Sequence, residues 1–454
     1  LFFSSFYFNV YGANFKYESS SAWIQKLDFR RRTDQISEGK NFQKFSISDE
    51  LTFSSSIPKS KTGQWDGQLS VRNISYSNPT LNDSLGQYYF LGQMDHSLSL
   101  QKNSIRIKNV YSIQSGAEPR VEFIFEERRP GDGDYIFMDF NGDGIRQIQE
   151  YVFAPEVDTA RFVRIQLFNS EYIQTFQSLL NQVVQVDFNR LLPSLHPKNF
   201  LRKLYFESIL RFNSKLSPES EWYQQINPFV LNQLGEKSLA FQKFSQQHMY
   251  VNRANPRYEI QHSILSSSNR QLLTSGVDER TILEFQSKSR LTTFSKMDWI
   301  FTYNFRNEKK FTESYALQNY LIESSKFEGN LVYRIHQNHR INGSFLYRNY
   351  KELETSFEKA GIKQFQIGGQ STIRKKISLR SEVKWIIIDY RGNSGTAVEY
   401  IMLDGFKDGN NLSMEYYLDI KFSDVITAQF SYFVRKSAES TPIQTGRASI
   451  RANF

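Results

Sequence analysis

Long segments of the chain alternate between apolar and polar residues with a period of two. In 412–422 the apolar positions are Leu412, Met414, Tyr416, Leu418, Ile420 and Phe422. The same period of two runs through 340–351, 377–390 and 425–436. A period of two places alternate side chains on opposite faces of a β-strand. These segments have 11 to 14 residues, whereas globular strands average roughly 5–6 residues and a tilted membrane strand needs roughly 9–11. Their length favours a transmembrane β-barrel over a soluble sandwich.

The last eleven residues, 444–454, have the pattern of a strand that closes such a barrel. One face carries small and apolar residues: Gly446, Ala448, Ile450, Ala452 and Phe454. The other face carries Arg447, Ser449, Arg451 and Asn453. Lipid on one side and a polar lumen on the other require this division, and a terminal aromatic suits the membrane interface. We expect 444–454 to be the barrel-closing strand and to be used in recognition during assembly.

The connections between these strands alternate between short and long. Tight turns are expected at 338–339, 375–376 and 423–424, and longer connections at 352–361, 391–410 and 437–443. Outer-membrane barrels have short periplasmic turns and longer external loops. The tight turns are therefore assigned to the periplasmic side. This assignment requires 398–403 to belong to an external loop and not to a spanning strand.

The composition narrows the alternatives. The longest apolar run, 385–388, is far shorter than the roughly 20 residues that a membrane helix needs. The chain has no cysteine, so disulfides and thiolate metal sites are excluded. The net charge is +9, but Lys and Arg are spread along strands among acidic residues, so nucleic-acid binding is not expected. The 39 Phe and 25 Tyr residues suit lipid-facing strands and interfacial girdles.

These patterns predict an all-β fold, a transmembrane antiparallel β-barrel of about 16–20 strands, with more if the chain is a fragment. About twelve strands are expected in 201–454 and about five or six in 1–116. Candidates in the N-terminal part are 42–55, 64–77, 87–100 and 105–112. Prolines and a Gly-Asp cluster break the pattern in 117–200, which predicts an inserted subdomain. Counting strands back from the C-terminus places this insert on the periplasmic side.

One motif in the insert has a defined chemistry. Residues 139–150 match the calcium-loop pattern D-x-[DN]-x-[DN]-G-x5-E, in which Gly144 permits the sharp turn. The expected oxygen ligands are Asp139, Asn141, Asp143, the Ile145 carbonyl, Gln147 and Glu150. Calcium prefers such an all-oxygen shell. The residues before the loop, 135–138, are strand-like, which favours a structural calcium ion over a sensor. The alternative is a turn without an ion, because Asp, Asn and Gly favour turns anyway.

No catalytic constellation is visible, and no enzymatic activity is expected. The six histidines are scattered, and no zinc-protease, P-loop, nucleophile-elbow or dinucleotide motif occurs. The inward positions of the C-terminal strands carry charges of both signs, including Arg334, Arg348, Arg380, Glu382, Lys384, Glu415, Asp419, Arg447 and Arg451. A solvated, salt-bridged interior explains them, and an ion-selective or solute-selective lumen is the alternative.

Two segments carry a resemblance together. The first is 134–164, with the loop motif and the run Asp158-Thr159-Ala160-Arg161-Phe162-Val163-Arg164, and the second is 432–454. This combination resembles the large outer-membrane β-barrel proteins of Bacteroidota. The resemblance implies an outer-membrane location in a Gram-negative bacterium and a barrel that follows a longer N-terminal region. It implies no reaction, and no TonB-box-and-plug arrangement is visible that would indicate a nutrient transporter of the usual kind.

The leading functional interpretation is a barrel subunit of an envelope transport, secretion or assembly complex. One alternative is a free-standing porin-like diffusion channel, and a second is a soluble or surface-anchored β-rich adhesion module. The expected partners are outer-membrane lipid, the barrel assembly machinery and other envelope proteins in a complex. Calcium is the expected cofactor, in a structural role.

Overall fold

The computed structural model describes residues 6–452 apart from several gaps. The gaps are 21, 39–40, 59, 61, 79–87, 155–158, 197, 218–219, 221, 228, 230–237, 274–275, 314, 355–356, 375 and 424. Asn453 and Phe454 lie outside the described residues, and so does part of two expected tight turns. The chain divides into two compact units, and each is described by itself. The first comprises 1–122, 168–248 and 266–279, and the second comprises 123–167, 249–265 and 280–454.

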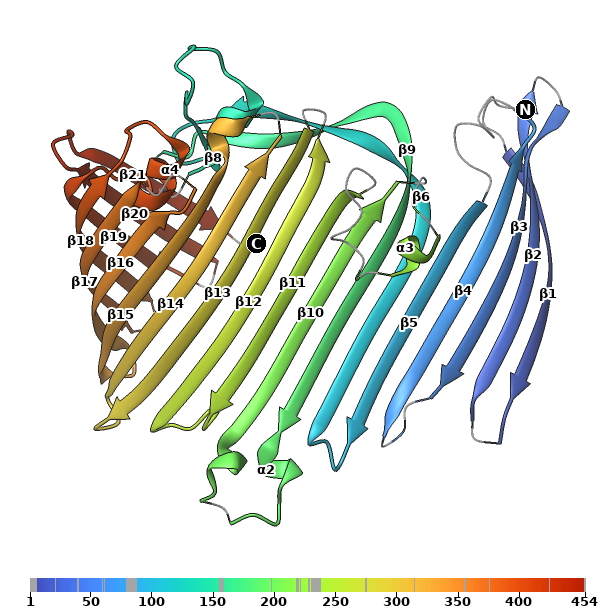
Figure 1. The fold of residues 1–454 in the computed structure, drawn as a ribbon, viewed down its shortest axis with the longest axis horizontal. Helices are drawn as coiled ribbons and strands as arrows, with labels where there is room; N and C mark the ends of the chain where they lie inside the picture. Colours follow the sequence, from blue (N-terminus) through green and yellow to red (C-terminus); the bar gives the residue numbers. More distant parts are fainter. Residues whose placement is uncertain are drawn as a thin grey trace. The chain divides into compact units, whose positions relative to one another are not determined.

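Antiparallel β-strands make up most of the described residues (Figure 1). The strands before the insert are β1 (Phe6–Glu18), β2 (Ile24–Glu38), β3 (Asn41–Ile57), β4 (Gly63–Tyr76), β5 (Tyr88–Leu100) and β6 (Ile105–Glu127). The next are β7 (Tyr135–Phe137), β8 (Tyr151–Phe153), β9 (Phe162–Asp187), β10 (Leu204–Leu216), β11 (Ser238–Val251), β12 (Tyr258–Leu273) and β13 (Gly276–Thr293). The last are β14 (Met297–Thr312), β15 (Tyr320–His336), β16 (His339–Glu352), β17 (Lys359–Ile373), β18 (Ile377–Arg391), β19 (Gly409–Lys421), β20 (Ile426–Ser437) and β21 (Ile443–Ala452).

Helical segments are few and short in the described part of the chain. They are η1 (Ile148–Glu150), α2 (Phe188–Leu191), η2 (Phe200–Lys203), α3 (Trp222–Ile226), η5 (Ala316–Gln318) and α4 (Ala397–Leu403). None of these helices is long and apolar enough to cross a membrane.

The expected all-β fold of long antiparallel strands is confirmed. Consecutive strands pair with each other from β1 and β2 through to β5 and β6, and from β14 and β15 through to β20 and β21. Of the 21 strands in the described residues, only β7 and β8 have three residues. The other 19 strands are long, and their number agrees with the expected 16–20. The predicted segments 340–351 and 377–390 correspond closely to β16 and β18.

The structure divides the expected insert 117–200 differently. β6 continues to Glu127, and β9 runs for 26 residues from Phe162. β9 pairs with β10 over a long register, from Asp187 opposite Tyr205 to Phe176 opposite Leu216. Adjacent apolar pairs at 179–180 and 183–184 break the period of two in β9, and this hid the strand from pattern analysis. The insert proper is 128–161.

The insert also lies at the other end of the strands from the one predicted. Tyr315 and Gln318, in the connection between β14 and β15, hydrogen-bond Glu150 and the Gln149 carbonyl of the insert. In an antiparallel meander this connection lies at the same end as the long connections after β16 and β18. The prediction was wrong because it missed β9, which adds one crossing between the insert and β10.

Strand register in the second unit separates an apolar face from a polar one. Phe345 lies opposite Phe365, which lies opposite Trp385, and these three side chains are 36%, 45% and 52% exposed. In β21, Ala448 lies opposite Phe430 on the same face. The other face carries ion pairs, including Arg280–Glu308, Arg306–Glu308, Arg334–Asp298, Arg348–Asp404, Lys384–Glu382 and Lys384–Glu415.

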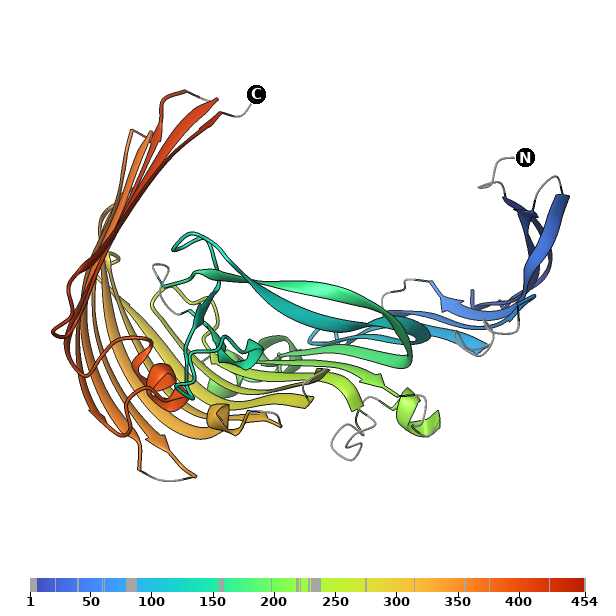
Figure 2. The same ribbon diagram turned by 90° about the horizontal axis from the view of Figure 1, so that it is seen from above.

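A small apolar core lies on the polar face at the end with the long connections. α4 begins where the Thr396 hydroxyl accepts the Glu399 N–H, and it ends at Asp404, whose φ is +52°. Met402 and Leu403 of α4 are 0% and 1% exposed, and they pack with Tyr320, Ile322, Ala360, Ile362, Ile386 and Ile388. Residues 398–403 are thus not a spanning strand, as the assignment of the turns requires. They form most of a helix that folds back onto the inner face. Figure 2 shows β14–β21 as a curved wall with the insert on its concave side.

Replacing Arg348 should loosen the loop that carries α4. The Arg348 guanidinium pairs with Asp404 at 3.1 Å and donates to the Tyr350 hydroxyl at 2.8 Å. We expect Arg348→Met to cost about 1 kcal/mol or less, because the pair is partly exposed, and to increase cleavage within 391–409. Limited proteolysis with mass spectrometry measures this. Lys363→Met, on the opposite face of β17, is the control, and equal cleavage in both variants would contradict the assigned contact.

Candidate metal centre and adjoining cavity

The calcium-loop motif lies between the two short strands of the insert. β7 and β8 form a hairpin in which Phe137 lies opposite Tyr151. Aromatic rings hold this hairpin to the ends of β6 and β9: Phe125 stacks on Tyr151 at 4.1 Å, and Phe162 contacts Tyr151 edge-on. These rings give the insert a core of its own, so the loop is carried on a packed support.

The loop backbone turns around Asp139. One carboxylate oxygen of Asp139 accepts the Gly142 N–H at 2.7 Å, and the other accepts the Gly144 N–H at 2.9 Å. Gly142 and Gly144 have φ of +73° and +71°, a backbone conformation that glycine adopts without strain. Asp143 accepts the Ile145 N–H at 2.7 Å. The motif therefore folds into a tight loop whose carboxylates converge.

Three carboxylates meet in this loop. Asp139, Asp143 and Glu150 each place an oxygen within 4.8 Å of the others. Asp139 and Asp143 are exposed, whereas Glu150 is 0% exposed. Like charges this close repel one another, and a buried carboxylate is costly without a counter-charge. The neighbouring cation, Arg146, pairs with Glu127 instead. A divalent cation with oxygen ligands fits this donor set.

The other predicted ligands lie close to the same group. The Asn141 side chain donates to Asp143 at 2.9 Å, and its oxygen accepts the Asp143 N–H. The Gln147 side chain donates to Asp143 at 2.8 Å, and its backbone N–H donates to Glu150. Ile145 is an exposed residue of the same loop. The full ligand set of Asp139, Asn141, Asp143, Ile145, Gln147 and Glu150 stays a prediction.

Sequence reasoning missed Tyr315. Its hydroxyl donates to a Glu150 carboxylate oxygen at 2.8 Å, across 165 residues of chain. Burial, and then the hydrogen bond to Glu150 and the negative charges of the loop, raise the pKa of Tyr315 well above its usual 10.0. Tyr315 is therefore a neutral donor at physiological pH. No local signal identifies it, because its partner is far away in the sequence.

Removing the Tyr315 hydroxyl should weaken the attachment of the loop. Tyr315→Phe leaves one oxygen of a fully buried carboxylate without a donor, which costs about 1–3 kcal/mol. Because the folded pKa is raised, this contribution is intact at neutral pH and is lost as pH rises above 10 through the folded pKa. Urea unfolding at pH 7.5, with Tyr333→Phe as the control, measures the effect. An unchanged unfolding free energy would refute the contact.

The insert has a second attachment, on the polar face of β21. The Arg447 guanidinium donates to the Pro130 carbonyl at 3.3 Å and pairs with Asp132 at 3.3 Å. Arg447 was predicted to face the lumen. The structure gives it a partner that the sequence pattern could not indicate, since Pro130 is 317 residues away. The insert thus contacts the wall of the second unit at both β21 and the β14–β15 connection.

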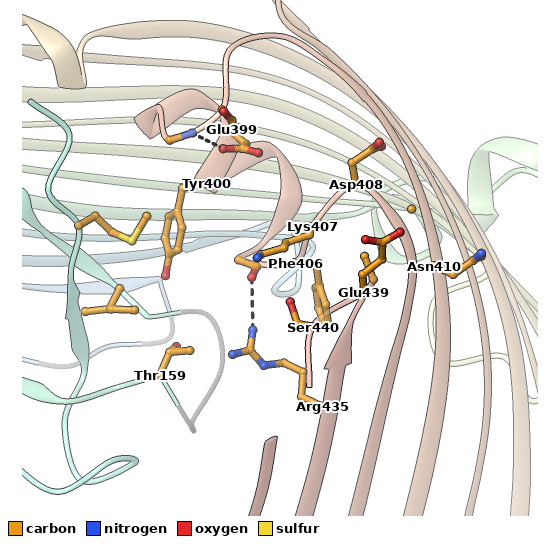
Figure 3. A pocket seen from close by; sticks show the side chains of 17 residues that line it. Thr159, Glu399, Tyr400, Phe406, Lys407, Asp408, Asn410, Arg435, Glu439 and Ser440 are labelled. Carbon is orange, nitrogen blue, oxygen red and sulfur yellow. Dashed lines mark hydrogen bonds between the residues drawn. The ribbon is translucent and has the colours of Figure 1, made fainter. Parts of the chain in front are cut away.

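A cavity of about 1150 Å³ lies beside the insert (Figure 3). Its walls come from three parts of the insert and wall strands: residues 136, 138 and 159 of the insert, α4 with the residues on either side of it, and the end of β20 with the turn to β21. The side chains lining it include Ile136, Met138, Thr159, Glu399, Tyr400, Lys407, Asp408, Arg435 and Glu439. Arg435 donates to the Gly405 carbonyl at 3.3 Å and lies over the Phe406 ring.

The length of the strands and the character of the two faces of the sheet indicate the class of protein. Strands of 13 to 18 residues, such as β19 and β13, exceed the roughly 9–11 residues that cross a membrane. One face is an exposed aromatic and aliphatic surface, and the other is polar and salt-bridged. A sheet can lie in lipid only as a barrel, and such antiparallel barrels belong to outer membranes. The chain is an outer-membrane β-barrel protein of a Gram-negative bacterium.

Comparisons with known proteins find no matching family and no matching curated protein. Among solved structures, the FrpB iron transporter from Neisseria meningitidis (F3-3 variant) aligns at 9% identity and a TM-score of 0.38, covering 99% of this chain and 66% of its own. The outer-membrane transporter YddB from Escherichia coli aligns at 9% identity and a TM-score of 0.34, over 98% and 68%. A loop-deletion mutant of OmpT from Vibrio cholerae aligns at 9% identity and a TM-score of 0.29, covering 84% of this chain and 94% of its own. These likenesses are weak, so the assignment depends on the strands of this chain.

Proposed function

We propose that this protein is the barrel subunit of an envelope transport, secretion or assembly complex, with a passage that is gated. The supporting observation is the position of the insert. The described residues of the insert, 128–154 and 159–161, are attached to the polar face of the second unit through the contacts of Glu150 with Tyr315 and of Asp132 with Arg447. A free-standing diffusion channel requires an unobstructed mouth, so a folded segment on the inner wall favours the gated interpretation.

Calcium has a structural role in this proposal. The ligands are Asp139, Asn141, Asp143, Ile145, Gln147 and Glu150. The ion supplies the positive charge that three converging carboxylates require, one of them fully buried. It also keeps Glu150 in position beneath the loop. Bound calcium thereby stabilises the segment that covers the inner wall. A bacterial source among the Bacteroidota belongs to the same proposal, since the loop and the segment 432–454 carry that resemblance.

Planar-bilayer recording tests the function. We expect the purified full chain to be closed for most of the record. A variant in which a short Gly-Ser linker replaces 130–159 should show a large, stable conductance. A similarly open pore in the full chain would support the porin-like diffusion channel. A protein released from membranes by carbonate, with no heat-dependent shift on SDS gels, would support the adhesion module.

Membership of a complex is tested separately. We expect cross-linking in intact cells, followed by purification in detergent, to recover other envelope proteins with the full chain in fixed proportion. Recovery of the chain alone, together with a closed pore, would contradict the complex while leaving the gated barrel standing.

A further inference from the structure

In the described part of the chain, the cavity beside the insert carries unpaired charges, whereas most charges on the polar face of β14–β19 are paired. Along β14–β19 most acidic groups are paired with bases: Glu308 with Arg280 and Arg306, Asp298 with Arg334, and Glu382 and Glu415 with Lys384. Lys407 and Glu439 both line the cavity and are exposed. Among the described residues, neither side chain forms an ion pair or a hydrogen bond. Opposite charges are thus available to a ligand at one site.

The opposite wall of the cavity is largely apolar. Ile136 and Met138 come from the insert, and Tyr400 comes from α4. Figure 3 shows Tyr400 on one side and Lys407, Arg435 and Glu439 on the other. An apolar wall facing a few polar groups is the usual construction of a small-ligand site. The cavity, about 1150 Å³, slightly exceeds the common range of roughly 300–1,000 Å³ for such sites.

The charges select the class of ligand. Three acidic residues line the cavity, Glu399, Asp408 and Glu439, against two bases, Lys407 and Arg435. A polyanion is therefore disfavoured. Two of the acids are already engaged: Glu399 accepts the Gly395 N–H at 2.6 Å, and Asp408 accepts the Tyr390 N–H at 2.8 Å. The groups that remain are an ammonium on Lys407 and a carboxylate on Glu439.

We infer that this cavity binds a short zwitterionic peptide. The peptide carboxylate pairs with Lys407, its ammonium pairs with Glu439, and an apolar side chain lies against Ile136, Met138 and Tyr400. A zwitterionic peptide can pair with both of these side chains. A neutral ligand would pair with neither of them, and an ion of a single sign would pair with only one. The inference goes beyond the proposed function, because it assigns a ligand class to a site on the end of the wall with the long connections.

Calorimetric titration of the full chain in detergent with calcium tests the inference, using the tripeptide Ala-Leu-Ala as probe. We expect binding of the free peptide, and about tenfold weaker binding of its N-acetylated and C-amidated forms, because each loses one charge-assisted contact. Lys407→Gln should weaken the free peptide about tenfold and leave the amidated form unchanged. Glu439→Gln should weaken the free peptide equally and leave the acetylated form unchanged.

Lys436→Gln is the matched control, since Lys436 follows Arg435 in β20 but lies on the other face. It should bind as the unmodified chain does. Equal affinity for free and capped peptides would overturn the inference, and so would the absence of binding at millimolar peptide. A heat-modifiable band in the same sample shows that the barrel is folded. Failure to bind with a folded, gated barrel would therefore reject the peptide site alone.

Discussion

An arginine placed on the lipid face of β17 should destabilise the protein strongly, and the same residue one position further along should not. Phe365 lies between Phe345 and Trp385 on the exposed apolar face, whereas Gln366 lies on the polar face. A cationic side chain in the middle of the lipid-facing band costs about 2–4 kcal/mol, while positions facing the lumen tolerate charge. We therefore expect Phe365→Arg to lose that amount and Gln366→Arg to lose less than about 1 kcal/mol.

Reversible urea unfolding in lipid vesicles measures the difference, and unheated SDS gels of the membrane fraction report assembly. Phe365→Leu keeps an apolar side chain and controls for the loss of ring packing against Phe345, whose ring centroid is 5.1 Å away. If both arginine variants unfold at the same urea concentration as the unmodified chain, neither face contacts lipid. The adhesion interpretation would then replace the membrane assignment.

If the loop holds calcium as proposed, replacing Asp139 and Glu150 together with alanine should remove the ion and release the insert. The double variant deletes two of the three converging carboxylates and leaves the buried Tyr315 hydroxyl without its acceptor. At a calcium concentration 100 times the dissociation constant, the lost binding alone corresponds to about 2.7 kcal/mol of stability. Metal analysis should show a loss of calcium from the purified protein, and limited proteolysis should show new cleavage within 130–165.

The control is Asp389→Ala with Glu354→Ala, which removes two exposed carboxylates outside the loop. It should keep its calcium and its protease resistance. A chelator should reproduce the effect of the loop variant on the unmodified chain. If the unmodified chain binds no calcium, and chelator leaves its cleavage pattern unchanged, residues 139–150 form a plain turn.

Most spanning strands of this protein are visible in its sequence. The period of two is clear in 412–422 and in most of 377–390, because one face of these strands is apolar and the other is largely polar, and both constraints act locally. β9 was not predicted, because its apolar pairs at 179–180 and 183–184 break the alternation of apolar and polar residues. Missing that single strand reversed the side assigned to the insert, since the side depends on the number of crossings.

The turn at 139–150 is predictable for a similar reason. Its carboxylates lie within twelve consecutive residues, so their spacing alone describes the turn around Asp139. The contacts that position the loop are different. Glu150 meets Tyr315 across 165 residues, and Pro130 meets Arg447 across 317. These residues are not related by any periodic pattern, so their contacts cannot be predicted from a single sequence.

The sequence by itself determined most of the segments that become strands and which face of these strands is apolar, because both follow from interactions between residues a few positions apart. It also indicated three carboxylates that converge in the loop at 139–150. Tertiary structure alone decided that α4 folds onto the inner wall, that the insert lies at the end with the long connections, and that Lys407 and Glu439 line one cavity with Met138. These arrangements depend on the number of strands and on packing between segments that are far apart in the sequence. Such contacts form only when the strands are paired into one sheet.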